Sequence, residues 1–345
     1  MNNIPDIYLA YIAILLGFAA LVWSADRFVA GAASIAKNMG ITPMIIGLTI
    51  VSFGTSAPEV LVSLNASING AGDLAVGNAI GSNIANVALV LAVTTLICRI
   101  PVSRHLLLDE LPVLLIISVM AGVFLMDSNI GRAEGWILLL SIVPIMFYII
   151  YRKKSEVSHD DISEEEIISS EDIPQLSQAM AFFWFAVGLI ALIVSSRVLV
   201  WGGETTASHF GVSPLIIGLT VIAVGTSLPD LAASLMSAIK GHHDIALGNI
   251  IGSNMFNLAA VMSLPGIISP VVMDSQVFTR DYAFMMAFMV LLAAAVIIAI
   301  TKQNSSSKRE SQKAVDVQSA SIGWPLGVIL LSGYIAYYVI LFVGL

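Results

Sequence analysis

Charged residues are scarce in this chain. They make up 11% of its 345 residues, whereas a soluble protein has about 25%. Hydrophobic residues reach 58% and the mean hydropathy is +0.93, which is more apolar surface than a water-facing exterior can hide. These values exclude an ordinary soluble protein. Since a spanning helix takes about 20 apolar residues, we predict an all-α polytopic membrane protein.

Several enzyme signatures are also missing. Cys98 is the single cysteine, so an internal disulfide is excluded. There is no GxxxxGK[ST] phosphate loop, which argues against ATP hydrolysis. There is no GxSxG element, and the five histidines fall near predicted span ends or in a polar segment, so no Ser–His pair can be assembled. We therefore predict a transporter with no cofactor, not an enzyme.

The net charge of −8 says little about partners. Eight of the 23 acidic residues lie in the polar segment 152–178, so the acidity is local. Nucleic acid is disfavoured as a partner, no obligatory protein partner is evident, and the lipid bilayer is the expected surrounding.

Apolar stretches predict ten spanning helices, five on each side of segment 152–178. The first thirty residues have no basic start and no clean cleavage site, so we expect them to form the first span. If the amino terminus lies outside, 11 of the 15 basic residues fall on the inside. The expected organisation is therefore five spans in 1–151, an acidic cytoplasmic linker at 152–178 and five spans in 179–345, with both termini outside.

An internal repeat is the strongest signal. Residues 43–86 align without a gap to residues 214–257, with 23 identities in 44 positions at a constant offset of 171. Five predicted crossings separate equivalent positions, and an odd number turns the second copy upside down. Inverted repeats are typical of alternating-access transporters, so we predict two inverted five-helix halves.

Each copy of the repeat carries one acid at membrane depth, Glu59 and Asp230. A carboxylate at the bilayer centre costs about 2.5–3.5 kcal/mol, which packing does not explain. Each acid follows a Gly-Thr-Ser-x-Pro sequence, and proline leaves the carbonyl four residues earlier without its helical partner. We therefore expect the second, third, seventh and eighth helices to be broken. Oxygens at i, i+3, i+4 and i+7 share one helical face with each acid: Ser52, Thr55 and Ser56 with Glu59, and the Ala223 carbonyl, Thr226 and Ser227 with Asp230.

The next helix of each copy adds a polar stripe, with residues at steps of four: Asn78, Ser82 and Asn86 in one copy, and Asn249, Ser253 and Asn257 in the other. Together these groups form an all-oxygen site without His or Cys, which suits calcium or sodium and not zinc or copper. Two negative charges match one Ca²⁺, or two or more Na⁺. A site that holds either set but not both is an exchanger.

At these residues the chain resembles the cation/Ca²⁺ exchanger superfamily, and its bacterial sodium/calcium antiporter branch in particular. GTSAPE with GSNIAN, and GTSLPD with GSNMFN, resemble its two α-repeat signatures. The resemblance implies exchange of Ca²⁺ against Na⁺ across the bacterial inner membrane, with Glu59 and Asp230 binding both ions. It further implies ion-binding roles for the following groups: the carbonyls of Ser52 and Ala223, the side chains of Thr55, Ser56, Ser82, Thr226, Ser227 and Ser253, and Asn86 and Asn257 at the centre.

Other interpretations stay open at this point. The same carboxylates could exchange H⁺ for Ca²⁺ or another divalent cation, and a passive cation channel is a more distant alternative. The GxxxG steps Gly77–Gly81 and Gly248–Gly252 favour helix packing. The sequence His242-His243-Asp244 favours a helix-capping Asp over a metal site. Arg27 and Arg197 receive no role in transport.

Overall fold

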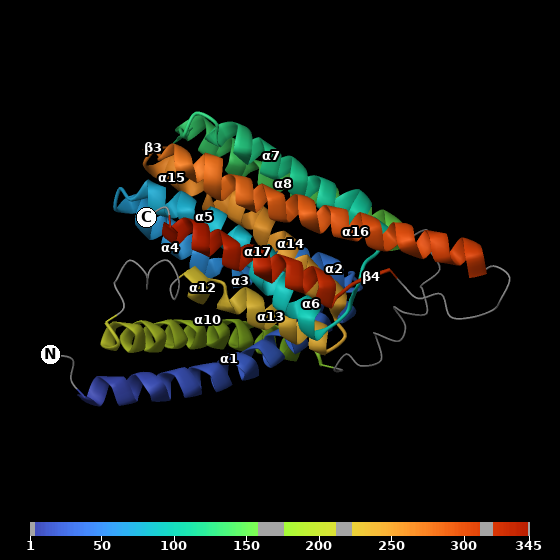
Figure 1. Cartoon of the computed structure of the whole chain (residues 1–345). Helices are drawn as coiled ribbons and strands as arrows, with labels where there is room; N and C mark the ends of the chain where they lie inside the picture. The colour runs from blue at the N-terminus through green and yellow to red at the C-terminus, as the bar shows by residue number, and fades with distance from the viewer. Residues whose placement is uncertain (1–3, 158–175, 212–222, 311–319, 344–345) are drawn as a thin grey trace. The chain divides into compact units, whose positions relative to one another are not determined.

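The computed structural model describes residues 4–157, 176–211, 223–310 and 320–343 (Figure 1). Most of the predicted linker therefore lies outside the described residues, as do residues 212–222 at the start of the second repeat copy. The chain divides into two compact units, which are described separately. The first contains residues 1–62 and 153–253, and the second contains residues 63–152 and 254–345.

Within the described residues, the predicted membrane protein is confirmed. Eight helices are long and apolar enough to cross a membrane, or nine if the bent pair Pro43–Thr55 and Ala57–Ile68 counts as one span. The predicted seventh span, 213–240, begins outside the described residues, and only the apolar helix Leu228–Ile239 represents it. The number of ten spans therefore stays a prediction.

Two long helices dominate the first unit, α1 (Ile4–Met39) and α10 (Gln178–His209), which run side by side in Figure 1. The shorter helices carry the repeated motifs, and α4 and α14 each begin in this unit and end in the second. These shorter helices are α2 (Pro43–Ile46), the π-helix η1 (Gly47–Val51), α3 (Ser52–Thr55), α4 (Ala57–Ile68), α12 (Ala223–Thr226), α13 (Leu228–Ile239) and α14 (His243–Phe256).

Glycines let α1 and α10 approach backbone to backbone. A Cβ atom at Gly188 would lie 2.5 Å from the Phe28 backbone nitrogen, and one at Gly17 would lie 3.0 Å from Leu199. The two contacts are equivalent, because an offset of 171 converts Gly17 to Gly188 and Phe28 to Leu199. A second reciprocal set joins Gly31 to Phe185 and Gly202 to Ile14. The repeat relation therefore extends beyond the two motifs to α1 and α10.

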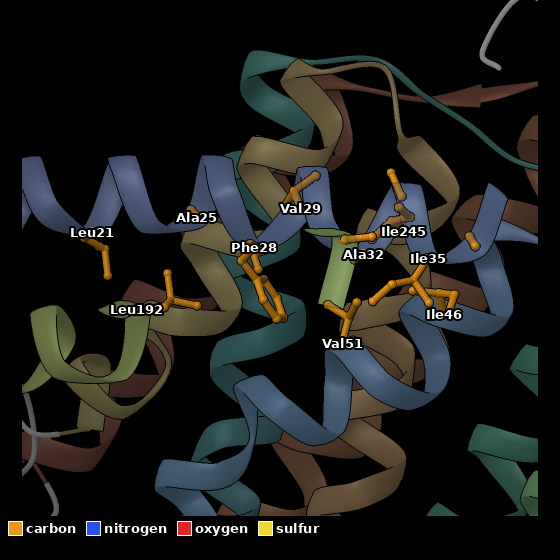
Figure 2. Packing of buried hydrophobic residues seen from close by; sticks show 14 residues of the cluster. Leu21, Ala25, Phe28, Val29, Ala32, Ile35, Ile46, Val51, Leu192 and Ile245 are labelled. Carbon is orange, nitrogen blue, oxygen red and sulfur yellow. The ribbon is translucent and has the colours of Figure 1, made fainter. Parts of the chain in front are cut away.

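The buried core of this unit lies where α1 faces α10, the α2–α3 segment, α13 and α14. Leu21 of α1 and Leu192 of α10, again 171 residues apart, point toward each other in Figure 2. Phe28, Val51 and Ile245 are wholly buried. Burying such a side chain contributes about 1.5–3 kcal/mol in water. In lipid the gain comes from close packing.

The second unit contains the remaining helices and two short antiparallel ribbons. The ribbons pair β1 (Ile100–Pro101) with β4 (Ser321–Ile322) and β2 (Asn129–Ile130) with β3 (Val271–Val272). Its helices are α5 (Gly72–Ala85), η2 (Asn86–Leu91), α6 (Ala92–Ile97), η3 (Leu106–Glu110), α7 (Leu111–Leu125), α8 (Arg132–Val157), η5 (Asn257–Val261), α15 (Ser263–Ile268), η6 (Val277–Tyr282), α16 (Ala283–Glu310) and α17 (Trp324–Val343). The residues of α8 after Arg152 belong to the first unit.

The predicted helix breaks are present in the second and seventh spans, but the breaks predicted in the third and eighth spans were wrong. The second predicted span bends by 45° between Thr55 and Ala57, and the single residue Ser227 separates α12 from α13. The predicted third and eighth spans are instead continuous from Gly72 to Ile97 and from His243 to Ile268. Each contains a π-helical segment, η2 or η5, in place of a sharp bend. π-helical turns are common at functional sites.

Two helices extend beyond the apolar stretches 130–151 and 276–301 of the sequence. Helix α8 continues to Val157, into the predicted linker 152–178, and α16 continues to Glu310. The added residues are mainly Lys, Arg, Glu and Ser, and the first three are good helix formers. The hydrogen-bonded helix therefore continues after the apolar surface has ended.

The packing interpretation of the GxxxG steps is confirmed for one copy of the repeat. A Cβ atom at Gly252 would lie 2.5 Å from Ser52 Oγ, and one at Gly248 would lie 2.8 Å from the Met44 carbonyl oxygen. For Gly77 and Gly81, no atom of the described residues would lie within 4 Å.

Candidate ion-binding site

The two repeated acids begin helices. Glu59 lies in the first turn of α4 and Asp230 in the first turn of α13. The prolines before them fit because a helix start needs no N–H at that position. A helix amino terminus also carries partial positive charge that favours a carboxylate. The Gly-Thr-Ser-x-Pro sequence therefore both interrupts a span and stabilises the acid that follows it.

Asp230 accepts three hydrogen bonds on a single oxygen. Its Oδ1 atom lies 2.8 Å from Thr55 Oγ1, 2.7 Å from Ser253 Oγ and 3.2 Å from Asn249 Nδ2. Asp230, Thr55 and Ser253 are wholly buried, at 0% exposure. Within the part of the chain that the structure describes, the second oxygen, Oδ2, has no hydrogen-bond partner. One carboxylate oxygen is thus fixed by neutral donors, and the other is left for a further partner.

Asn249 holds this arrangement in place. Its Nδ2 atom also lies 2.9 Å from Ser234 Oγ, and Thr55 Oγ1 lies 2.9 Å from its Oδ1. Ser234 is a residue that the sequence analysis did not select. The sequence does contain a pattern that could have identified it: both copies of the repeat have a serine four residues after the acid, Ser63 and Ser234.

Glu59 belongs to the same unit and is also wholly buried. Thr55, four residues before Glu59, lies 2.8 Å from Asp230 Oδ1, so the segments that carry the two acids are in contact. The acids of the two repeat copies are therefore both buried within one unit, and their sharing of one ion site stays a prediction. Placing two negative charges in a buried position is costly unless a positive charge compensates them.

The predicted hydroxyl groups differ in their surroundings. Ser52 Oγ donates to the Leu48 carbonyl at 2.8 Å, which is ordinary bonding within a helix. Ser56 and Ser227 are both 1% exposed, and their Oγ atoms have no hydrogen-bond partner among the described residues. Thr226 is half-buried. For Ala223 only the backbone is described, in the first position of α12.

Pro229 is predicted to release the Gly225 carbonyl, and this carbonyl has a partner from the protein. It accepts a hydrogen bond from Ser196 Oγ of α10 at 3.1 Å. The Ser52 carbonyl, a predicted ion ligand, accepts from the Ser56 N–H at 3.0 Å and from Thr55 Oγ1 at 3.3 Å. A carbonyl oxygen has two lone pairs, so a second partner is still possible at Gly225.

Three predicted site residues belong to the second unit: Ser82, Asn86 and Asn257. They are 3%, 0% and 0% exposed. Asn86 begins η2 and Asn257 begins η5, so both asparagines predicted at the centre start a π-helical segment. Their amide groups have no hydrogen-bond partner among the described residues. Buried amides normally have such partners, which makes both available to a ligand.

The remaining sequence interpretations are partly tested. Within the described residues, no group of three or more His, Cys, Asp and Glu side chains could hold a metal ion. Helix α14 begins at His243, and Asp244 lies in its first turn and not at the cap position. The Arg27 guanidinium lies 5.1 Å from the ring centre of Trp184, a favourable cation–π contact.

Comparison with known proteins identifies the family. The family model described as sodium/calcium exchanger protein matches residues 9–151 and 180–343. A putative antiporter, CaxA, of Alkalimonas amylolytica is 48% identical over 278 residues, which cover 81% of this chain and 86% of that protein. The inner membrane protein YrbG of Escherichia coli (strain K12) is 39% identical, over 83% of this chain and 88% of that protein.

A solved structure gives the same result. The sodium-calcium exchanger NCX_Mj, soaked with Na⁺ and Ca²⁺, is similar to this chain with a TM-score of 0.77 and 26% identity. The similarity covers 96% of this chain and 98% of that one. The match of the family model, which includes both helix groups around the acidic linker, carries the conclusion. This chain belongs to the sodium/calcium exchanger family.

Proposed function

We propose that this chain is a secondary active antiporter that exchanges Ca²⁺ against Na⁺ by alternating access. The observation that carries the proposal is the buried pair of acids, Glu59 and Asp230, from the two repeat copies. The described hydrogen bonds of Asp230 come from neutral side chains only. In this proposal, the ions that enter and leave balance the negative charge of Asp230 and Glu59.

The donor set supports hard cations. Carboxylate, hydroxyl, amide and carbonyl oxygens are the ligands of Ca²⁺ and Na⁺. One Ca²⁺, or two or more Na⁺, balances the two carboxylates, so the two ion sets compete for the same oxygens. In this proposal the ion ligands are Glu59, Asp230, Thr55, Ser56, Ser82, Asn86, Thr226, Ser227, Ser253 and Asn257, with the carbonyls of Ser52 and Ala223.

The proposed architecture has ten spanning helices in two inverted halves. The repeat at an offset of 171 and the reciprocal glycine contacts of α1 and α10 support it. We propose a bacterial inner membrane location with both termini outside and segment 152–178 in the cytoplasm, as the distribution of Lys and Arg favours. The relative YrbG of Escherichia coli is an inner membrane protein, which fits this location.

A flux measurement tests the proposal. Everted membrane vesicles that contain the protein are loaded with Na⁺, diluted into Na⁺-free medium, and supplied with radioactive Ca²⁺. We expect Ca²⁺ uptake that depends on the outward Na⁺ gradient and stops when a Na⁺ ionophore removes the gradient. Vesicles from cells without the protein are the control.

Two results would contradict the proposal. Uptake driven by a pH gradient and indifferent to Na⁺ would identify an H⁺/Ca²⁺ antiporter that uses the same carboxylates. Ca²⁺ flux that needs no counter-ion would identify a passive channel. Substituting other divalent cations for Ca²⁺ in the same vesicles identifies the divalent substrate.

A further inference from the structure

An ion pair joins the long helix α1 to the helix that carries Asp230. Lys240, the residue after α13, places its Nζ atom 2.6 Å from Asp26 Oδ1 and 3.4 Å from the Asp26 carbonyl oxygen. The Lys240 side chain is 28% exposed and the Asp26 side chain is 35% exposed, so the protein partly shields this ion pair. Asp230 lies in the first turn of the same helix α13. The position of α1 is thus connected directly to a helix of the ion site.

Neighbouring residues of α1 contact two different helices. Arg27 places its guanidinium over Trp184 of α10, whereas Asp26 contacts Lys240 at the end of α13. The contact with α10 is reinforced by the glycine positions along the helix pair, including Gly31. Helix α1 is therefore held to α10 by close packing, and to α13 by apolar packing around Ala233 and by an ion pair, which can break and re-form.

The repeat shows that this ion pair exists in one half only. At the offset of 171, Asp26 is equivalent to Arg197, and Lys240 is equivalent to Asn69. An arginine and an asparagine cannot form an ion pair. The other copy therefore has no electrostatic counterpart of the Asp26–Lys240 contact.

We propose that Asp26 and Lys240 are positioning residues that bias the antiporter toward one of its two access conformations. This inference rests on the proposed function. In a transporter built from inverted halves, a change of access exchanges the contacts of one half for the equivalent contacts of the other. The conformation described here contains the Asp26–Lys240 pair, whereas the equivalent residues, Arg197 and Asn69, cannot supply an ion pair to the opposite conformation. The ion pair therefore stabilises the described conformation.

The ratio of Ca²⁺ affinities on the two membrane faces measures this bias. The apparent dissociation constant on each face is the intrinsic constant divided by the fraction of protein open to that face. The ratio of the two half-saturation constants therefore follows the equilibrium between the conformations. It is measured as Na⁺-dependent Ca²⁺ uptake in everted and in right-side-out vesicles. A substitution that only damages the fold lowers the maximal rate and leaves this ratio unchanged.

We expect Asp26→Asn and Lys240→Gln each to change the ratio about two- to fivefold and in the same direction, as expected for a partly exposed ion pair. The double variant should match Asp26→Asn, because Asp26→Asn already removes the pair with Lys240, together with the 3.7 Å contact between Asp26 and Arg27 Nε. Exchanging the charges, Asp26→Lys with Lys240→Asp, should return the ratio toward the wild-type value. Arg152→Gln, which breaks an ion pair with Asp109, is the matched control and should leave the ratio unchanged.

The outcomes separate the two proposals. If the wild type exchanges Ca²⁺ for Na⁺ and the ratio is the same in all variants, the inference on Asp26 and Lys240 is wrong and the proposed function stands. If the two single variants change the ratio in opposite directions, the inference is also wrong. If the wild type shows no exchange, the proposed function fails and this inference fails with it.

Discussion

Two buried aspartates of this protein are neutralised in different ways. In the second unit, Asp109 is 2% exposed and lies 2.9 Å from Arg152 Nε, with Tyr148 OH at 3.3 Å. In the first unit, Asp230 is hydrogen bonded by neutral groups, Thr55 among them, and lies near a second acid. Asp109 thus has a cation built into the protein, whereas no cation of the described residues contacts Asp230. A buried acid without a built-in cation can receive one from solution, which is what ion transport requires.

The largest expected effect separates these two acids directly. We expect Asp230→Asn to lower Na⁺-driven Ca²⁺ uptake more than about 100-fold, because an amide cannot balance the charge of the ion. Glu59→Gln should do the same. Asp109→Asn is the control and should retain uptake within a few fold. Vesicle uptake is normalised to the amount of inserted protein, and wild-type flux in Asp230→Asn would show that the site is elsewhere.

A second substitution tests the neutral donors. Thr55→Val keeps the size of the side chain and removes the hydroxyl that donates to Asp230. A hydrogen bond to a charged group is worth about 1.5–3 kcal/mol, so the Ca²⁺ half-saturation constant should rise about tenfold to a hundredfold. Thr55→Ser, which keeps the hydroxyl, should stay within about threefold of the wild type. Equal constants for Thr55→Val and Thr55→Ser would remove this hydroxyl from the site.

A third substitution tests the built-in cation. Arg152→Gln leaves Asp109 without its ion pair, and since the Arg152 side chain is 48% exposed, the loss of stability should be about 1 kcal/mol. Thermal unfolding of the purified protein in detergent measures this loss. The Ca²⁺ half-saturation constant should not change, because Asp109 has no role in ion binding. A change in that constant without a change in stability would reverse the assignment of the two aspartates.

The smallest expected effect concerns Ser234. Its hydroxyl lies 2.9 Å from the amide of Asn249, which in turn contacts Asp230. Loss of one such hydrogen bond costs about 0.5–1.5 kcal/mol, so Ser234→Ala should raise the Ca²⁺ half-saturation constant roughly threefold. The equivalent change Ser63→Ala is the control, because Ser63 donates to the Val261 carbonyl and should leave the constant unchanged. Identical effects of both changes would indicate a general loss of stability.

Much of the site could be predicted because a carboxylate in an apolar segment has a high free-energy cost. A carboxylate in an apolar run is expensive wherever it occurs, so Glu59 and Asp230 stand out without a structure. Their recurrence at a fixed offset predicts that they serve one purpose. The roles of the hydroxyl groups at helical spacing were harder to predict. Ser52 Oγ donates a hydrogen bond within its own helix, whereas Ser56 Oγ and Ser227 Oγ have no such bond among the described residues. Helical spacing predicts on which face of the helix a hydroxyl oxygen lies, but not which group it forms a hydrogen bond with.

Other features depend on contacts that spacing does not encode. The π-helical segments that begin at Asn86 and Asn257 follow from packing, since a π-turn has no composition of its own. The Gly225 carbonyl accepts a hydrogen bond from Ser196, which lies on a different helix, 29 residues away in the chain. Ser234 and the Asp26–Lys240 pair join distant parts of one unit. The extensions of α8 and α16 beyond their apolar stretches depend on helix propensity, which hydropathy does not measure.

The amino-acid sequence by itself determined that this is a membrane protein, that it contains an internal repeat and that each copy of the repeat has one acid at membrane depth. It did so because hydropathy, spacing and the cost of buried charge act locally and can be counted along the chain. Only the tertiary structure decided which neutral groups hold Asp230, which acid has its own arginine and which half carries an ion pair to α1. These depend on contacts between residues distant in the chain, and hydrogen bonds and ion pairs form only at distances that folding sets.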